Sequence, residues 1–363
     1  MPNKRVIAIH LPQFYPFPEN DEWWGKGFTE WRNVVQAKPR FFKHYQPHIP
    51  ADLGFYDLRL KQSRISQQEL ASKYGIYGFC YYHYWFNGHL LMEKPVEEML
   101  RDNDEKMPFM LCWANENWHR NWSGRDNVIL MEQHYSEEDD IAHFKYLLPY
   151  FKDSRYIRVN GKPVFAIYKV QYIPDVERMI QTFQRMAKEE GFELYICKFE
   201  ANGCRGKQFM KKGINAAIDF QPINNDGFCV KYTFFIKALN RLFPFIKKGY
   251  KYSYSKYVKY RCNMPYTTEY KIFPCVSPCW DNSSRRVGGI YTVFHGSTPK
   301  LFRKWLRTIY RNFKPFSDEE NLIFINAWNE WAEGCHLEPD LKYGDGYLNA
   351  IKTVVEEEKV SKK

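Results

Sequence analysis

The sequence predicts an α/β protein in which eight parallel strands close into a (β/α)8 barrel, the TIM-barrel architecture. Three observations favour it: eight short apolar runs recur along the 363 residues, segments with helical periodicity separate them, and polar groups beside aromatic rings follow most of the runs. Alternating strands and helices form parallel pairs through right-handed crossovers, and eight such units close a barrel. An open doubly wound sheet also fits the periodicity, but the sequence has no GxGxxG or GxxxxGK[ST] motif for a nucleotide.

The expected strands are short apolar runs. In chain order they are Val6–His10, Tyr77–Tyr82, Phe109–Trp113, Val164–Tyr168, Leu194–Cys197, Ala217–Phe220, Ile272–Val276 and Leu322–Ile325. Helical spacing or composition indicates helices at Leu58–Lys73, Val96–Asp102, Glu137–Tyr150, Val176–Glu190 and Pro299–Phe313. We expect residues 1–363 to form a single catalytic domain with long βα loops, interrupted by a basic and aromatic insertion at 223–270 between the sixth and seventh strands.

Composition narrows the class of protein. Hydrophobic residues make up 44% of the chain, and the 18% aromatic share suits either a surface that stacks on rings or an aromatic-rich core. No run approaches the roughly 20 apolar residues of a membrane span, and the first apolar run is too short for a signal peptide. Nine scattered cysteines favour a reducing cytoplasm over a disulfide framework. Cys275 and Cys279 are expected to be buried thiols rather than zinc ligands.

The segment Trp328–Gly334 carries two carboxyls between indoles, directly after the last expected strand. Glu330 and Glu333 are three positions apart, so on a helical turn they share a face. Two such carboxyls can divide acid and base duties if their surroundings separate their pKa values. Aromatic faces such as those of Trp328 and Trp331 stack on sugar rings. The segment predicts a catalytic site for sugars, and an exposed acidic pair beside two core tryptophans is the alternative.

Catalytic and binding residues of a barrel lie just after the strands, at the C-terminal face. The candidate substrate-binding residues at these exits are His10, Gln13, Tyr15, His83, Tyr84, Trp85, Trp113, Asn115, Glu116, Trp118, Tyr168, Trp280, Asp281, Trp328, Asn329 and Trp331. Hydrogen-bonding groups beside aromatic rings are typical of a carbohydrate cleft. Each signal alone is weak, because a histidine such as His10 or His83 is more often structural.

The connection between the first two expected strands is far longer than an ordinary βα loop. Its Glu22–Trp31 stretch is dense in indoles, glycines and charges, and Trp24 and Trp31 are candidate substrate-binding residues. We interpret the stretch as a binding loop. The alternative is a loop that closes one end of the barrel with its tryptophans.

Three separated motifs resemble the WbsX family of polysaccharide-biosynthesis proteins. They are Ile9–Tyr15, Trp23–Trp31 and Trp328–Gly334. That family is similar to glycoside hydrolase family 99, which contains endo-acting α-1,2-mannosidases and mannanases on a (β/α)8 barrel. The resemblance extends from the first strand to the eighth, although residues 223–270 match nothing in it.

The resemblance implies specific roles for the two glutamates. In family 99 the Glu-x-x-Glu after strand eight carries the chemistry, and by motif Glu330 takes the first place and Glu333 the second. The first glutamate is the base on the substrate's own 2-hydroxyl, which attacks the anomeric carbon to give a 1,2-anhydro sugar. The second protonates the leaving oxygen, and water or another acceptor then opens the epoxide with net retention. This scheme, with an oligosaccharide or polysaccharide substrate, needs no metal and no cofactor.

A donor-dependent glycosyltransferase of O-antigen or capsule biosynthesis is the alternative function, because the WbsX name carries a glycosyltransferase label. Asp102-Asn103-Asp104 spells the DxD of a metal clamp for diphosphates. It precedes the third expected strand and therefore falls on the wrong face of a barrel.

The charge of the chain is concentrated in one region. The net charge is +11, and residues 228–271 hold ten basic residues against one acidic residue. Apolar positions between Tyr232 and Ile246 repeat at helical spacing opposite Lys237 and Arg241. Residues 231–260 therefore suit contact with an anionic membrane, at the inner leaflet for a cytoplasmic enzyme. A packed insertion with a solvated basic face is the alternative. We expect no nucleic-acid partner, since no recognition motif accompanies the basic stretch.

Overall fold

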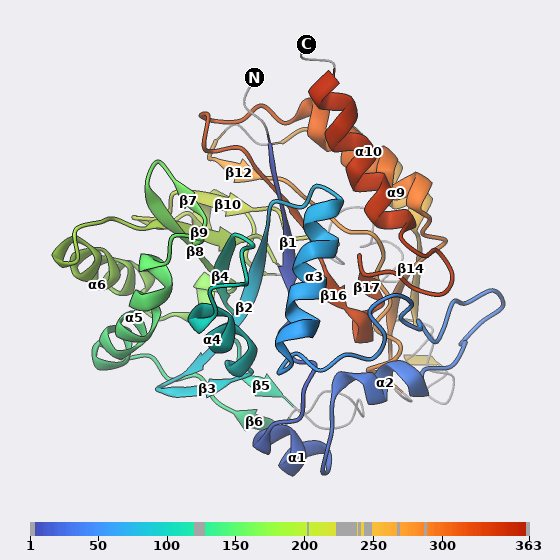
Figure 1. Cartoon of the computed structure of the whole chain (residues 1–363), viewed down its shortest axis with the longest axis horizontal. Coiled ribbons are helices and arrows are strands. Elements are labelled where there is room, and N and C mark those ends of the chain that lie inside the picture. The colour runs from blue at the N-terminus through green and yellow to red at the C-terminus, as the bar shows by residue number, and fades with distance from the viewer. Residues whose placement is uncertain are drawn as a thin grey trace.

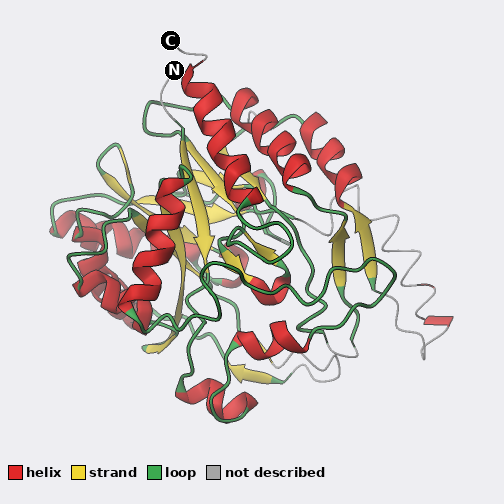
Figure 2. Ribbon diagram, turned by 45° about the vertical axis from the view of Figure 1, so that its right-hand side comes forward, coloured by secondary structure: helices red, strands yellow, loops and turns green. Residues whose placement is uncertain are grey.

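The computed structural model describes residues 4–119, 128–201, 203–222, 238, 241–242, 249–266, 269–286 and 289–360. Parallel strands form a barrel in the middle of the molecule, and helices surround it (Figures 1 and 2). The order of hydrogen-bonded strands is β12-β10-β9-β8-β4-β2-β1-β15-β13. This order follows the chain around the barrel, as the sequence predicts.

All eight predicted strands are present. They are β1 (Arg5–His10), β2 (Gly78–Phe86), β4 (Phe109–Trp113), β8 (Lys162–Ile167), β9 (Tyr195–Phe199), β10 (Ala216–Ile218), β12 (Ile272–Phe273) with β13 (Cys275–Val276), and β15 (Leu322–Ile325). Nearly every side chain of these strands is buried, because the barrel interior covers one face and the helices cover the other.

The seventh predicted strand is divided in two at Pro274, and this division closes the barrel. β12 pairs in parallel with β10, whereas β13 pairs in parallel with β15. Proline has no N–H to donate, but the Pro274 carbonyl accepts the Phe324 amide at 2.8 Å. The sheet therefore continues from β10 to β15 through the divided strand, and the open doubly wound alternative is wrong.

The five predicted helices are also confirmed. They are α3 (Lys61–Lys73), α4 (Lys94–Arg101), α5 (Glu137–Lys152), α6 (Val176–Glu189) and α9 (Pro299–Asn312). Side-chain caps explain where two of them begin. The Ser136 hydroxyl accepts the Asp139 amide at 3.1 Å before α5, and Thr298 accepts the Leu301 amide at 3.3 Å before α9.

Further elements lie outside the predicted set. The helices are α1 (Pro18–Trp24), α2 (Glu30–Gln36), α8 (Tyr254–Asn263) and α10 (Gly346–Val360). The short strands are β3 (His89–Leu91), β5 (Trp118–His119), β6 (Ile129–Met131), β7 (Arg158–Val159), β11 (Tyr250–Ser253), β14 (Thr292–His295), β16 (Asn329–Glu330) and β17 (Cys335–His336). Among the short strands, β5 with β6 and β16 with β17 form antiparallel pairs beyond the barrel strands, where they extend the rim of the barrel.

The described end of the basic insertion packs on the barrel. α8 lies against α9, and α9 lies against α10, so three helices run side by side along one flank (Figure 2). Tyr254 and Tyr257 of α8 are buried, and both rings meet the Trp305 ring edge-on. The predicted amphipathic helix over 232–246 falls outside the described residues apart from positions 238, 241 and 242. Membrane contact through residues 231–260 therefore stays a prediction.

Two further expectations concern cysteines and membrane spans. The eight cysteines in the described ranges are all free thiols. Burial raises the pKa of both the Cys275 and Cys279 thiols, which agrees with the expectation that they are ordinary buried thiols. Within the same ranges, no helix is long and apolar enough to cross a bilayer.

Candidate active site

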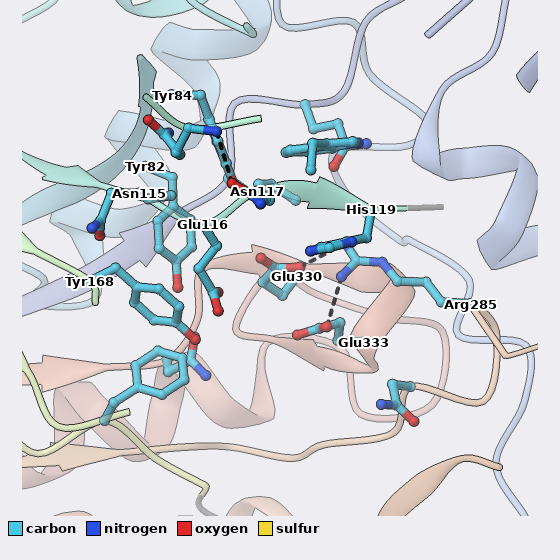
Figure 3. Close-up of a pocket in the computed structure, with 18 of the residues that line it drawn as sticks. Tyr82, Tyr84, Asn115, Glu116, Asn117, His119, Tyr168, Arg285, Glu330 and Glu333 are labelled. Carbon is cyan, nitrogen blue, oxygen red and sulfur yellow. Dashed lines mark hydrogen bonds and ion pairs between the residues drawn. The ribbon is translucent and has the colours of Figure 1, made fainter. Parts of the chain in front are cut away.

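A cleft of about 820 Å³ opens at the C-terminal ends of the barrel strands. Nine of the predicted site residues line it: Gln13, Tyr84, Asn115, Glu116, Trp118, Tyr168, Trp280, Glu330 and Glu333. Figure 3 shows Tyr82, Tyr168 and Glu116 on one side of the two glutamates and Arg285 on the other. The cleft is thus walled by tyrosines and has carboxyl groups in its floor.

The local backbone brings Glu330 and Glu333 to the same face. Glu330 ends β16, and residues Trp331–Glu333 form one 3₁₀ turn that Gly334 terminates in the left-handed conformation. A 3₁₀ helix has three residues per turn, so side chains at i and i+3 eclipse each other. Both carboxyls therefore point into the cleft, while Trp331 between them is buried.

Arg285 joins the two glutamates to a third carboxyl, that of Glu30 in α2. Its Nη1 lies 2.7 Å from Glu333 Oε1, its Nη2 lies 3.2 Å from Glu330 Oε2, and its Nε lies 2.9 Å from Glu30 Oε2. Two of the dashed lines in Figure 3 mark its contacts with Glu330 and Glu333. One planar guanidinium thus fixes the relative positions of three carboxyls from distant parts of the chain.

The surroundings of the cluster favour the protonated forms of Glu330 and Glu333. Burial raises the pKa of Glu330 to about 8, with the charges of Glu333 and Glu30 adding to the effect and Arg285 opposing it. Burial likewise raises the pKa of Glu333, again opposed by Arg285. Three carboxyls share one close guanidinium, so the cluster retains a proton near neutral pH that the two glutamates hold in common.

Strand alternation decides which residues of β2 reach the cleft. Tyr82 and Tyr84 line it. His83 and Trp85 point to the opposite face, toward α5, where His83 Nε2 lies 2.9 Å from His143 Nε2 and Trp85 Nε1 donates to Asp139 at 2.9 Å. The structure thus places the predicted residues His83 and Trp85 outside the cleft and brings in Tyr82 instead.

Two asparagines near the cleft act as backbone clamps. The Asn115 amide accepts the Lys169 N–H at 2.8 Å and donates to the Lys169 carbonyl at 2.9 Å, which ties the ends of β4 and β8 together. Asn329 makes the same pair of bonds with Leu11, accepting its N–H at 2.8 Å and donating to its carbonyl at 2.9 Å. Asn329 therefore holds β16 against the end of β1 instead of lining the cleft.

The other predicted residues lie behind the cleft wall rather than on it. They are His10, Tyr15, Trp24, Trp31, Trp113, Asp281, Trp328 and Trp331. His10 Nε2 pairs with Gln67 of α3 at 3.0 Å, and the Asp281 carboxylate binds His44 and Gln46 at 2.6 and 2.7 Å. Trp31 packs on Trp331 with ring centroids 5.7 Å apart, so the Glu22–Trp31 stretch supplies core packing through Trp31 and the cleft carboxyl through Glu30.

The prediction of site residues from sequence missed Glu30, Tyr82 and Arg285. Glu30 stands in the aromatic loop motif, so its position between Phe28 and Trp31 was the available signal. Tyr82 lies two positions before Tyr84 on the same strand, and side chains two positions apart on a strand point to the same face, so this spacing could have indicated Tyr82. Arg285 lies beyond the seventh strand in no motif, and nothing in the sequence distinguishes it from the other basic residues.

Gly334 is required by the geometry of the turn that carries Glu330 and Glu333. Its φ is +52°, and a Cβ there would lie 2.9 Å from Asp281 Cβ and 3.0 Å from the Asp281 carbonyl oxygen. We expect Gly334→Ala to lower the free energy of unfolding by roughly 2–4 kcal/mol, from left-handed strain plus overpacking, and to lower turnover by displacing Glu333. Urea unfolding and kcat measure the two effects.

The matched control is Gly344→Ala. Gly344 also has a left-handed φ of +51°, but nothing lies within 4 Å of a Cβ there. This variant isolates the backbone strain, roughly 1–2 kcal/mol, and should keep wild-type turnover. Equal losses in the two variants would contradict a specific role for the close approach of Asp281.

The family of the chain is given by comparison with known proteins. A family model described as "Glycosyltransferase WbsX" matches residues 6–351. The chain belongs to the WbsX family. Two proteins named WxcX, from strains of Xanthomonas campestris pv. campestris, are each 37% identical to this WbsX-family chain over 349 residues, which is 96% of it. The chain spans about half the length (49%) of these curated relatives.

Solved structures agree with the barrel fold of this WbsX-family member. A glycoside hydrolase-like protein superposes with a TM-score of 0.61 at 17% identity, covering 98% of this chain and 94% of that protein. The GH99 endo-α-mannosidase from Bacteroides thetaiotaomicron superposes with a TM-score of 0.60 at 12% identity, covering 100% and 99%. The resemblance to the WbsX family and the barrel fold expected from it are confirmed.

Proposed function

We propose that this chain is a retaining enzyme that cleaves or transfers glycosidic bonds of a mannoside-like glycan in cell-surface polysaccharide metabolism. The observation that supports it best is the contact of Arg285 with Glu30, Glu330 and Glu333 at the floor of a tyrosine-walled cleft. Such a cleft offers apolar ring faces for sugar C–H groups and hydrogen-bonding groups for hydroxyls. Its volume, about 820 Å³, is large enough for more than one sugar ring.

In this proposal Glu330 is the base and Glu333 is the acid. Glu330 removes the proton of the sugar 2-hydroxyl as that oxygen attacks the anomeric carbon, and Glu333 protonates the departing oxygen. Burial raises the pKa of Glu330 to about 8 in the free protein, which favours its protonated form there. A hydrogen bond from the bound 2-hydroxyl favours the charged form of Glu330, so the shared proton moves to Glu333 when substrate binds.

The substrate is proposed to be an oligosaccharide or polysaccharide, acted on in the cytoplasm and, through residues 231–260, near an anionic inner leaflet. A donor-dependent glycosyltransferase is the second candidate, because the matching family model is described as a glycosyltransferase. In the described part of the chain, Asp102 and Asp104 of the DxD sequence pair with Lys61 at 2.8 and 2.5 Å rather than lining the cleft.

The decisive experiment compares a mannoside-containing oligosaccharide with its 2-deoxy and 2-fluoro analogues at the reacting ring. We expect turnover of the parent with retention at the anomeric carbon and no turnover of either analogue, because neither carries the 2-hydroxyl nucleophile. Ready turnover of the analogues would point to an enzyme nucleophile instead. Turnover of a nucleotide sugar, with thermal stabilisation by that donor and no reaction of any oligosaccharide alone, would favour the second candidate.

A further inference from the structure

Three buried side chains meet behind Trp331, outside the cleft. His48 Nδ1 lies 2.8 Å from His336 Nε2, and His336 Nε2 lies 3.8 Å from Asp340 Oδ2. The exposed fractions of the three residues are 6%, 1% and 3%. One ligand atom from each residue lies within 4.8 Å of the others, and within the described ranges no other group of three or more His, Cys, Asp or Glu residues meets this condition.

The hydrogen bonds around the cluster leave acceptor atoms facing one another. His336 Nδ1 lies 2.9 Å from the Glu338 carbonyl, so Nδ1 carries the ring proton and Nε2 presents a lone pair. Asp340 Oδ1 accepts the amides of Lys342 and Tyr343 at 3.0 and 2.6 Å, and its other oxygen faces His336. The Tyr45 hydroxyl also hydrogen-bonds to the Asp340 carboxylate. A proton on His48 Nδ1 can bridge to His336, but His336 Nε2 and Asp340 Oδ2 then still face each other at 3.8 Å with no proton between them.

We propose that His48, His336 and Asp340 bind a divalent transition-metal ion, with Zn²⁺ the best match. Two imidazole nitrogens and one carboxylate oxygen are a ligand set that zinc accepts, and a fourth position is left for water. The bond from His336 Nδ1 to a backbone carbonyl is the outer contact that orients metal-binding histidines. Zn–N bonds of about 2.0–2.1 Å at a tetrahedral angle separate the nitrogens by about 3.3 Å, so binding opens the two rings by roughly 0.5 Å.

A second buried histidine pair provides an internal comparison. His83 Nε2 and His143 Nε2 lie 2.9 Å apart, nearly the separation of the His48–His336 pair. The exposed fractions of His83 and His143 are 7% and 1%, close to the 6% and 1% of His48 and His336. The difference is the third ligand, since no His, Cys, Asp or Glu among the described residues joins His83 and His143 in such a group. Asp340 is therefore the feature that distinguishes a metal site from an ordinary imidazole pair.

The position of the site indicates a structural role for the ion. His48 belongs to the long loop after β1, whereas His336 ends β17 and Asp340 follows it. The ion therefore links two segments that are 288 residues apart in the sequence. The same loop holds Asp281 through His44 and Gln46, and the His336 ring stacks on Trp331 at 3.7 Å. An ion here fixes the wall behind Glu330 and Glu333 without touching substrate.

The test measures metal content and Co²⁺ absorption on the full chain, purified without a histidine tag. We expect about one bound Zn²⁺ per chain after growth with zinc, and visible d–d absorption on replacing it with Co²⁺. Asp340→Asn and His336→Gln should lose both signals, whereas His143→Gln, in the comparison pair, should keep them. A chelator should lower the unfolding temperature of wild type and His143→Gln but not of Asp340→Asn.

Two results would overturn the site. One is wild-type protein that carries no metal and shows neither Co²⁺ absorption nor thermal stabilisation with excess Zn²⁺ or Co²⁺. The other is undiminished metal in both Asp340→Asn and His336→Gln, which would place the ion elsewhere. If a variant fails to fold, the metal content and chelator response of the wild type still decide the question.

Discussion

Glu330→Gln and Glu333→Gln should each lower kcat by at least about 10³-fold on an oligosaccharide substrate, because each removes one member of the proposed acid and base pair. Neither change should weaken the fold. Glutamine keeps the shape of the side chain and removes one of three carboxyls gathered around Arg285, so repulsion within the cluster falls. Thermal unfolding at or above the wild-type temperature checks this expectation. Wild-type turnover in both variants would end the proposal.

A substrate with an activated leaving group separates the two roles. An aryl leaving group that departs without protonation needs the base but not the acid. We therefore expect such a glycoside to restore most of the rate in Glu333→Gln and little of it in Glu330→Gln. The reverse pattern would exchange the assignments and would match the raised pKa of Glu330, about 8, in the free protein.

Arg285→Met should strongly lower the stability of the fold. The methionine keeps much of the side-chain bulk but removes the cation that faces three buried carboxyls. Breaking a buried ion cluster by removing one partner costs about 3–5 kcal/mol, and turnover should also fall because Glu330 and Glu333 lose their common anchor. Urea unfolding and kcat measure the two effects.

The loss in Arg285→Met should depend on pH. Without the guanidinium, the folded-state pKa values of Glu330 and Glu333, already above the ordinary 4.5, rise further. A carboxyl whose pKa is higher in the folded state than in the unfolded state stabilises the fold at low pH. This stabilisation is complete below the unfolded-state pKa and is lost as the pH rises through the folded-state pKa. The deficit relative to wild type should therefore be small near pH 5 and large near pH 8. A deficit independent of pH would mean that lost packing, rather than charge, explains it.

Arg64→Met is the matched control for this variant. Arg64 is buried and pairs with Glu98 and Glu105, each at 2.9 Å, but it lies on α3 and does not line the cleft. It should lose comparable stability while the folded fraction keeps its kcat. Loss of turnover in both arginine variants would indicate that activity falls because the whole fold is less stable, and not because the contacts of Arg285 in the cleft are lost.

The barrel could be predicted from the sequence because its strands are short, apolar and buried on both faces, and because capped helices separate them. Strand seven shows where this reasoning ends. The run Ile272–Val276 predicts one strand, but Pro274 divides its pairing between β10 and β15. A local hydrophobic pattern indicates that a strand forms but does not indicate which strands it pairs with. The closing of the barrel is a property of the whole sheet.

The candidate site could be predicted less completely than the fold. Glu330 and Glu333 could be found because one motif carries both and the 3₁₀ turn eclipses them. Arg285 and Glu30 are 255 residues apart and meet only in the folded protein, so no local pattern could pair them. His83 and Trp85 were misplaced for a simpler reason, since side chains on a strand alternate between faces and only Tyr82 and Tyr84 face the cleft.

The clamp between Asn329 and Leu11 has a consequence for how family members can be recombined. The side-chain amide reproduces both hydrogen bonds of a peptide group, so the first strand and the glutamate-bearing turn are joined as if by an extra rung of the sheet. Leu11 and Asn329 are 318 residues apart in the sequence. A chimaera that exchanges only one of the two segments pairs the Asn329 turn of one family member with the first strand of another. The two segments should therefore be exchanged together.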